Sequence, residues 1–474
     1  MLTDTAATSK STRSVVSPAR DEWREDLGET TLADLSRGWG RSLESSVPPR
    51  APRVHAVELE RHVRRVFDRN APFTIGVEEE LLLLEPDTGR LAPIAPHALA
   101  LLEGDRRFVS ELRCSQIEFV TPVCCTAADA VREMSYARSI ASDRLAGLAR
   151  IAAVGVHPIT RDPGPIMPGQ RYGWIVADNP QIARRLLTCG LHVHVAVGGA
   201  ERSLAVYNAL RGWLPEIVAL GANAPFHEGF DSGLATVRPS LNRLLPRSGV
   251  PPSFRSWAAY ADFCAWTANG GASRDATHHW WDLRLHPTYG TIEVRAADVQ
   301  TRLQDAATVI ALVQSLVFSL ANRYDAGEAL PLFSSERIAE NTWLAARDGL
   351  HGALIAETGE RYRTSTYLSA LVDQLMPAAT ELGCAEELLG IERIIGEGGG
   401  ASRQREVAES KGTDSLWAWL ANETSEPVEQ PFEPSARPAV PRAPVAKAGV
   451  DRVLEGLAGS VTQPSDRGTR AARM

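Results

Sequence analysis

Residues 281–298, WDLRLHPTYGTIEVRAAD, place the strongest constraint on the fold. Two short runs alternate polar and apolar residues around the turn-like sequence PTYG at 287–290, so the pattern predicts a β-hairpin. With residue 286 opposite residue 291, the pairs on one face are His286–Thr291, Arg284–Glu293 and Asp282–Arg295. The other face is apolar. The charged face is either a solvated set of ion pairs or a site that holds metal and phosphate.

Length and charge exclude several classes of protein. The 474 residues can bury one or two large cores, and a net charge of −8 gives no reason to expect nucleic-acid binding. No apolar run is long enough for a membrane span, and the N-terminus lacks the apolar segment of a secretory signal. The six cysteines show no CxxC spacing, so we expect small, mostly buried thiols. A cytoplasmic protein is the simplest expectation.

Composition divides the chain into three parts. Residues 1–56 are rich in Ser, Thr, Arg and Pro, and residues 426–474 are rich in Pro, Ala and Arg. Both lack a sustained apolar pattern, so we predict disordered tails. Residues 57–425 are expected to form the folded, functional domain.

An acidic strand is predicted at residues 73–84, FTIGVEEELLLL. Alternation places Glu78 and Glu80 together on the polar face, whereas Glu79 falls on the apolar side and must lie at an edge or be paired. Neighbouring carboxylates repel one another, and a divalent cation such as Mg²⁺ removes that cost. The alternative is a solvated acidic face.

Two further segments supply similar groups. Residues 108–121, FVSELRCSQIEFVT, carry Glu111 and Glu118, with Glu118 on the polar face of a strand. Residues 189–199, CGLHVHVAVGG, place His192 and His194 on one strand face, from which both can reach one metal ion. A zinc site with two histidines is the competing interpretation.

The remaining pattern is mainly helical. Apolar spacing predicts helices at 126–150, 201–222 with a possible kink at Pro215, 302–323, 334–349, 366–383, 386–395 and 402–420. Between them, residues 221–240 are rich in Gly, Pro and Asn and carry Asn223 and Arg238, which suits a substrate-binding loop. The run GEGGG at 396–400 is interpreted as a turn between helices rather than a nucleotide clamp.

Together, the polar strand faces supply the parts of a Mg²⁺ cluster with arginines beside it. Such a cluster neutralises nucleotide phosphates, and arginine stabilises the charge on a transferred phosphoryl group. No Walker A sequence is present, so strand-borne carboxylates are the predicted means of binding ATP.

The chain resembles a known family at several motifs in the same order. These are GVEEE (76–80), IEFVTPV (117–123), CGLHVHV (189–195), ANAPFHEGFDSGLATVR (222–238), WWDLRLHP (280–287), TIEVRAAD (291–298), AENTWLAARDGL (339–350) and LGCAEEL (382–388). From about residue 73 to 422 the sequence is similar to the type 2 glutamate–cysteine ligases, or carboxylate–amine ligases, of the glutamine synthetase-like superfamily. The resemblance implies an α+β fold: a curved antiparallel β-sheet backed by helices, with a helical C-terminal part.

The resemblance also implies a reaction: ATP phosphorylates the glutamate γ-carboxylate, and the cysteine α-amine attacks the acyl phosphate. It further implies three sets of residues: metal ligands, catalytic residues that include the phosphate-binding arginines, and substrate contacts. The implied metal ligands are Glu78, Glu80, Glu111, Glu118, His192 and Glu293. The implied catalytic residues are Arg284, Arg295 and Glu293, of which the two arginines also bind the nucleotide phosphates. The implied substrate contacts are Arg238 for a carboxylate, His194 and Asn223.

Small departures from the family pattern lie near the substrate loop. Serine is usual at Gly221 and Ala224, and threonine is usual at Ser232, which leaves the two substrates open. The alternatives are amide formation between another acid and amine, a metal-dependent hydrolase that uses His192 and His194, and a nucleotide-binding protein without catalysis. The family suggests a homodimer.

Overall fold

A computed structural model describes residues 54–102, 105, 107–273 and 275–426. The two predicted tails lie outside these residues, apart from residues 54–56 and residue 426 at their inner ends. The first described helix, α2, spans Ala56–Arg69.

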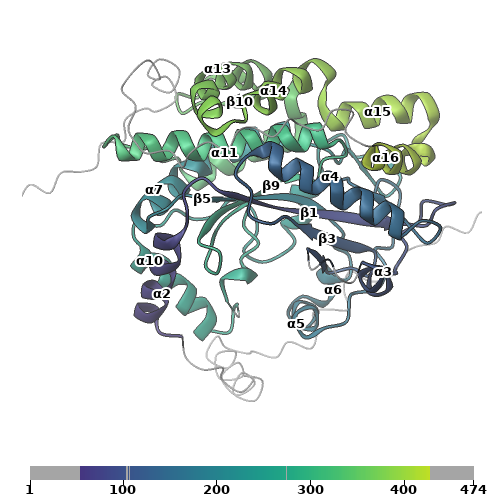
Figure 1. The fold of residues 1–474 in the computed structure, drawn as a ribbon, viewed down its shortest axis with the longest axis horizontal. Helices are drawn as coiled ribbons and strands as arrows, with labels where there is room; N and C mark the ends of the chain where they lie inside the picture. The colour runs from purple at the N-terminus through teal and green to yellow at the C-terminus, as the bar shows by residue number, and fades with distance from the viewer. Residues whose placement is uncertain (1–53, 103–104, 106, 274, 427–474) are drawn as a thin grey trace, which may run out of the picture. The chain divides into compact units, whose positions relative to one another are not determined.

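A curved antiparallel sheet of seven strands forms the centre of the fold (Figure 1). The strand order is β2-β3-β1-β5-β9-β8, and β4 pairs with β1. The strands are β1 (Ile75–Leu84), β2 (Phe108–Ser110), β3 (Gln116–Val120), β4 (Arg150–Ala152), β5 (Gly190–Ala196), β8 (Leu283–His286) and β9 (Thr291–Asp298). The α+β fold with a curved antiparallel sheet, predicted above, is confirmed.

The hairpin predicted at 281–298 has the expected register. Arg284 lies opposite Glu293 and His286 opposite Thr291, and the backbone N–H of Arg295 donates to the carbonyl of Asp282 at 2.8 Å. The pairing of β5 with β9 shifts register between Leu191 and Val193. This irregularity lies beside the polar residues of both strands.

Helices cover one face of the sheet (Figure 1). They are α4 (Ala127–Arg144), α11 (Leu303–Asp325), α13 (Thr364–Leu382), α14 (Ala385–Glu397), α15 (Gly399–Lys411) and α16 (Leu416–Ser425). The prediction that no apolar run is long enough for a membrane span was wrong by length and composition, because helix α11 passes both criteria; 89% of its apolar window is, however, buried within the protein. It contacts α4, α13, α14 and β5 and is the central core helix.

The fold contains further, mostly short elements. They are α3 (Ala95–Leu101), α5 (Gln170–Asp178), α6 (Pro180–Ala183), α7 (Ala200–Leu210), η1 (Arg211–Trp213), α8 (Leu214–Leu220), α9 (Arg238–Asn242), α10 (Trp257–Asn269), η2 (Ala276–His278), α12 (Ser335–Asp348), η3 (Gly349–His351) and η4 (Thr413–Ser415), with the short hairpins β6 (Phe226–His227)–β7 (Phe230–Asp231) and β10 (Ala353–Ile355)–β11 (Arg361–Arg363). Of these, α7 contacts α11, and η4 joins α15 to α16. Helices α5 and α6 lie on the side of the sheet opposite α11 (Figure 1).

Several predicted boundaries differ from the structure. The helix predicted at 201–222 is divided by η1 just before Pro215, and the helix predicted at 402–420 is two helices separated by η4. The GEGGG run lies at a junction of two helices, as predicted, but the turn is a single residue: Gly398, with φ of 83°, separates α14 from α15, and the other four residues belong to the two helices. Five of the six unpaired cysteines are buried, and Cys125 is exposed.

Glu79 points to the helical side of β1, as its position in the alternation requires. It is fully buried and forms an ion pair with Arg138 of α4 at 2.5 Å. Arg138 also donates to the carbonyl oxygens of Gln300 and Thr301. The pair therefore fixes α4 on the sheet and leaves the opposite face of β1 to Glu78 and Glu80.

Candidate active site

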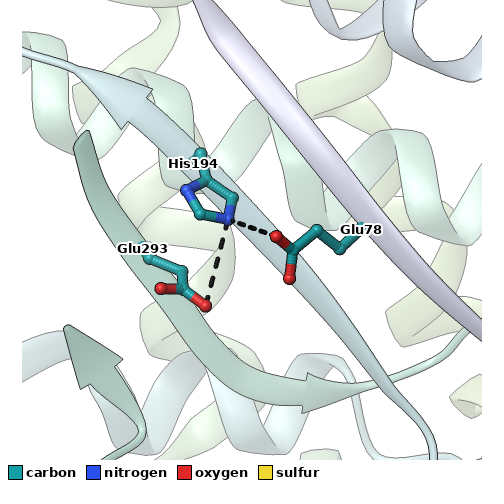
Figure 2. A group of neighbouring side chains, drawn as sticks. All are labelled: Glu78, His194 and Glu293. Carbon is teal, nitrogen blue, oxygen red and sulfur yellow. Dashed lines mark hydrogen bonds and ion pairs between the residues drawn. The ribbon is translucent and has the colours of Figure 1, made fainter. Parts of the chain in front are cut away.

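Three neighbouring strands bring a carboxylate–histidine group together on the open face of the sheet. Glu78 comes from β1, His194 from β5 and Glu293 from β9, and their side chains point toward one another (Figure 2). The His194 Nε2 atom lies 3.1 Å from a Glu78 oxygen and 3.9 Å from a Glu293 oxygen. One ligand atom from each residue lies within 4.8 Å of the others, which is close enough for one metal ion.

A second group of the same kind shares Glu78. It contains Glu118 of β3 and His192 of β5, again with ligand atoms within 4.8 Å of one another. Glu118 lies opposite Glu80 in the sheet, and the backbone N–H of Gly190 donates to Glu80 at 2.6 Å. The strand alternation predicted from the sequence therefore places these acids on one face.

The charges of this face are unbalanced without a cation. Burial, with the charges of Glu78, Glu111 and Glu80, raises the pKa of Glu118 well above its usual value. Burial and Glu111 raise the pKa of Glu80 to about 8, and burial also raises the pKa of Glu111. These carboxyl groups would take up protons, whereas a divalent cation would keep them ionised.

His192 has a free ligand atom at this position. Its Nδ1 atom lies 2.9 Å from Glu78, but its buried Nε2 atom has no hydrogen-bond partner among the described residues. Burial and the charge of Arg295 lower the pKa of His192 to about 4, so its ring is neutral at physiological pH. A neutral imidazole among carboxylate oxygens fits a divalent metal site.

Two arginines surround Glu293. Arg284 donates to both carboxylate oxygens at 2.7 and 2.9 Å, and Arg295 donates to one of them at 2.5 Å. Burial of Glu293 opposes its ionisation, but the two arginines outweigh this effect and hold its pKa well below the usual value. Arg284 also donates from Nη1 to the carbonyl of Thr277 at 3.0 Å. Arg295 instead lines an adjoining cavity, where it can meet a ligand.

This cavity has a volume of about 110 Å³ and lies beside the carboxylates. The charged residues that line it are Glu80, Glu111, Arg171, Arg238, Asp282 and Arg295. Gly190 is required next to it, because a Cβ atom there would lie 2.2 Å from Arg238 Nη2 and 2.8 Å from His192 Nε2. The missing side chain lets the arginine and the histidine approach the strand.

Two predicted substrate contacts are placed differently from the rest. Asn223 is fully buried, and its amide binds the Val299 carbonyl, Thr301 and Gln404, so its polar atoms are used by the fold. His194 has both ring nitrogens occupied, by Thr291 and Glu78. The polar atoms of both residues are therefore engaged within the protein, and His194 belongs to one of the two groups that could hold a metal ion.

Other residues of the cavity were not predicted. Arg171 and Tyr172 come from α5, and Trp280 precedes the hairpin. The sequence signals were weak, because α5 is a short helix without a charged pair or a metal-ligand pattern. The aromatic pair at 280–281 within the motif WWDLRLHP was the signal available.

Comparisons with known proteins identify the family of the chain. Residues 74–428 match the family described as glutamate-cysteine ligase family 2. The chain is 37% identical over 348 residues to the "Putative glutamate–cysteine ligase 2-1" of Rubrobacter xylanophilus, covering 72% of this chain and 92% of the relative. It is 35% identical over 356 residues to the "Putative glutamate–cysteine ligase 2" of Corynebacterium glutamicum, covering 73% and 94%.

A solved structure shares the fold at low sequence identity. The glutamate–cysteine ligase of Francisella tularensis in complex with AMP matches with a TM-score of 0.57 and 12% identity, covering 74% of this chain and 88% of that one. The fold, the site and the relatives together define an ATP-dependent ligase. Within that class, the chain belongs to glutamate–cysteine ligase family 2.

Proposed function

We propose that the protein joins the γ-carboxylate of glutamate to the α-amine of cysteine, with ATP consumed through an acyl phosphate. The observation that carries this proposal is the pair of carboxylate–histidine groups that share Glu78, with Arg295 beside them. Such a site suits polyphosphate bound through divalent cations. The family membership supports glutamate and cysteine as the two substrates.

The first step is phosphoryl transfer. A γ-carboxylate oxygen attacks the terminal phosphorus of ATP, the bond to ADP breaks, and Arg295 stabilises the charge on the transferred group. Arg284 holds Glu293 in place through two hydrogen bonds, which also orients Arg295. Glu78, Glu118, His192, His194 and Glu293 would hold Mg²⁺, with Glu80 and Glu111 nearby; bound Mg²⁺ would supply charge neutralisation at the phosphates.

The second step is amide formation. The amine nitrogen attacks the acyl carbon, the C–N bond forms, and phosphate leaves with the electrons of the C–O bond. The nitrogen loses its surplus protons to phosphate and solvent. Because an acyl phosphate is hydrolysed by water, the site must exclude water during this step. The side chains of the site are themselves shielded from water, with His192 2% and Glu293 0% exposed, and this suits the requirement.

The arginines also distinguish this proposal from a metal-dependent hydrolase. Arg284 and Arg295 lie directly on Glu293, a position that favours an anionic phosphate over a metal-bound hydroxide. The cytoplasm is the proposed location, supported by ATP use and by the six unpaired cysteines. A homodimer stays an expectation from the family, to be checked by light scattering of the purified protein.

The test is phosphate release from ATP and Mg²⁺ with glutamate and a panel of amines. We expect release that requires both glutamate and cysteine, and a loss of at least about a hundredfold in Glu78→Gln, because that residue belongs to both metal groups. The matched control is Asp87→Asn, an exposed acid just beyond the end of β1, which should retain activity.

Two other results would change the proposal. Release with a different acid–amine pair would keep the mechanism and replace the named substrates. Binding of ATP and Mg²⁺ without release for any pair would overturn the ligase proposal in favour of a nucleotide-binding role.

A further inference from the structure

The cavity beside the metal groups contains a carboxylate that the fold leaves unused. Asp282 precedes β8 and lines the cavity, yet its side chain makes no hydrogen bond or ion pair with the residues that the structure describes. Its backbone, in contrast, is fixed on both sides: its N–H donates to the Gly249 carbonyl, and its carbonyl accepts from Arg295. The carboxylate is therefore held at a defined place without a partner.

Leaving Asp282 unpaired costs free energy. Burial raises its pKa, although the charges of Arg238, Arg243 and Arg295 oppose this effect. None of these arginines lies within 4.0 Å of the carboxylate, so none forms an ion pair with it. Asp282 also belongs to neither of the two metal groups. A carboxylate in this position suits a ligand that brings a positive charge.

Arg238, on the same cavity, has the opposite character. It is 4% exposed, and its Nε atom has no hydrogen-bond partner in residues 54–426 as far as they are described. Its other nitrogens make long contacts of 3.4 and 3.2 Å to the carbonyls of Ala296 and Arg295. Its contact with Asp298 is also long, at 3.9 Å. A buried guanidinium this poorly satisfied has donors to spare for an anionic group.

The third feature is an apolar wall. Leu112, Ile175, Leu186 and Leu245 form a small hydrophobic cluster separate from the main core, and Trp280 packs against it. All five residues also line the cavity. Apolar side chains that line part of a charged cavity give binding energy to an apolar part of a ligand rather than to phosphate.

We propose that Asp282 and Arg238 hold the ammonium and the carboxylate of the acceptor, an α-amino acid bound as a zwitterion, with its side chain against this apolar wall. This inference rests on the proposed function and defines the acceptor by class: an α-amino acid with an apolar or thiol side chain. The glutamate γ-carboxylate must instead reach the metal groups. Because the glutamate side chain ends in that carboxylate, glutamate has no apolar group to place against Trp280 and Leu245.

The protein-side test compares Asp282→Asn with the wild type, using cysteine, leucine and phenylalanine as acceptors. We expect kcat/KM for the best acceptor to fall by about 10- to 150-fold, mainly through KM, because a charge-assisted hydrogen bond is lost. Asp282→Glu should recover part of the loss. The matched control, Asp262→Asn, changes an exposed acid of α10 and should leave KM unchanged.

Hydroxylamine separates this inference from the proposed function. It is largely uncharged at neutral pH and captures acyl phosphates as hydroxamates, so it needs no carboxylate for binding. Asp282→Asn should lose a larger fraction of its rate with the amino acid acceptor than with hydroxylamine, whereas a fault in phosphoryl transfer would lower both rates equally. Absence of hydroxamate in the wild type would mean that the proposed function itself fails.

The ligand-side test uses only the wild-type protein, so it does not depend on folding of a variant. Leucine, 3-methylbutylamine and 4-methylpentanoate are compared as competitors of the acceptor. Leucine should compete at least about tenfold better than either truncated compound, because each lacks one charged end. Competition by 3-methylbutylamine as strong as that by leucine would overturn the inference. So would an effect of Asp282→Asn that is confined to the KM of glutamate.

Discussion

At the scale of single residues, the clearest test of the site is Gly190. A Cβ atom at this position would lie 2.2 Å from Arg238 Nη2 and 2.8 Å from His192 Nε2. Gly190→Ala must therefore displace both side chains, and a misplacement of about 1 Å can cost about a hundredfold in rate. We expect a loss of that order in ligase activity, while the free energy of unfolding changes little because the end of an arginine side chain is flexible.

Gly396→Ala is the matched control for this prediction. Gly396 lies in α14, where an added Cβ would meet nothing within 4 Å, so activity should be retained. Thermal unfolding and steady-state kinetics of both variants provide the measurement. Full activity in Gly190→Ala would show that Arg238 and His192 need not hold their observed positions.

Strand alternation predicted which side chains share the site but not how each is used. Glu78, Glu80 and Glu118 fall on the predicted face because a period of two residues is fixed by the backbone. The sequence could not show that His194 binds Thr291 and Glu78, or that Asn223 is enclosed by Gln404, since these contacts join segments far apart in the chain. The contacts of a side chain depend on the register between strands and on the conformation of loops, and neither is fixed by the alternation within one strand.

At the scale of elements, the ion pair between β1 and α4 fixes the helical layer on the sheet. Glu79 is 0% and Arg138 2% exposed, so replacing the arginine leaves a buried, unpaired carboxylate. We expect Arg138→Met to lower the free energy of unfolding by about 3–5 kcal/mol. Urea unfolding followed by circular dichroism measures this change.

An exposed pair provides the comparison. Arg90 and Glu85 lie 2.9 Å apart, but the arginine side chain is 75% exposed. Arg90→Met should cost less than about 1 kcal/mol, because water and salt screen such a pair. Similar losses in both variants would contradict the role assigned to burial.

Long elements were predicted better than short ones. The periodicity of α11 and the alternation of β1 extend over enough residues to define both elements, and the 281–298 hairpin was predicted with its register. The hairpin β10–β11 and helix α5 were missed because three-residue strands and a nine-residue helix carry little periodic signal. Their formation depends on tertiary contacts, such as that of Tyr172 with the Ser110 carbonyl.

At the scale of the whole molecule, Glu216 links protonation to stability. It lies in α8, is 3% exposed and accepts a hydrogen bond from the Tyr362 hydroxyl at 2.8 Å, yet its second oxygen has no hydrogen-bond partner within the described part of the chain. Burial raises its pKa from the model-peptide value of 4.5 to about 7, although the tyrosine opposes this shift. The folded state therefore binds this proton more tightly than the unfolded state does.

The sign of the pH effect follows from that difference. The stabilisation is complete below about pH 4.5 and is lost as pH rises toward 7, with a slope of up to about 1.4 kcal/mol per pH unit from this group. Glu216→Gln stays neutral and keeps an acceptor for Tyr362. At pH 8 we expect this variant to be more stable than the wild type by about 1–3 kcal/mol, with the difference nearly absent at pH 5.

Urea unfolding at both pH values tests this prediction, and the difference between variant and wild type cancels the other titrating groups. Glu409→Gln, which neutralises an exposed acid of α15, should give the same small change at pH 5 and pH 8. A stability difference for Glu216→Gln that does not vary with pH would mean that Glu216 is already ionised at pH 5 in the folded protein. Its carboxylate would then need a water molecule at the oxygen that lacks a hydrogen-bond partner among the described residues.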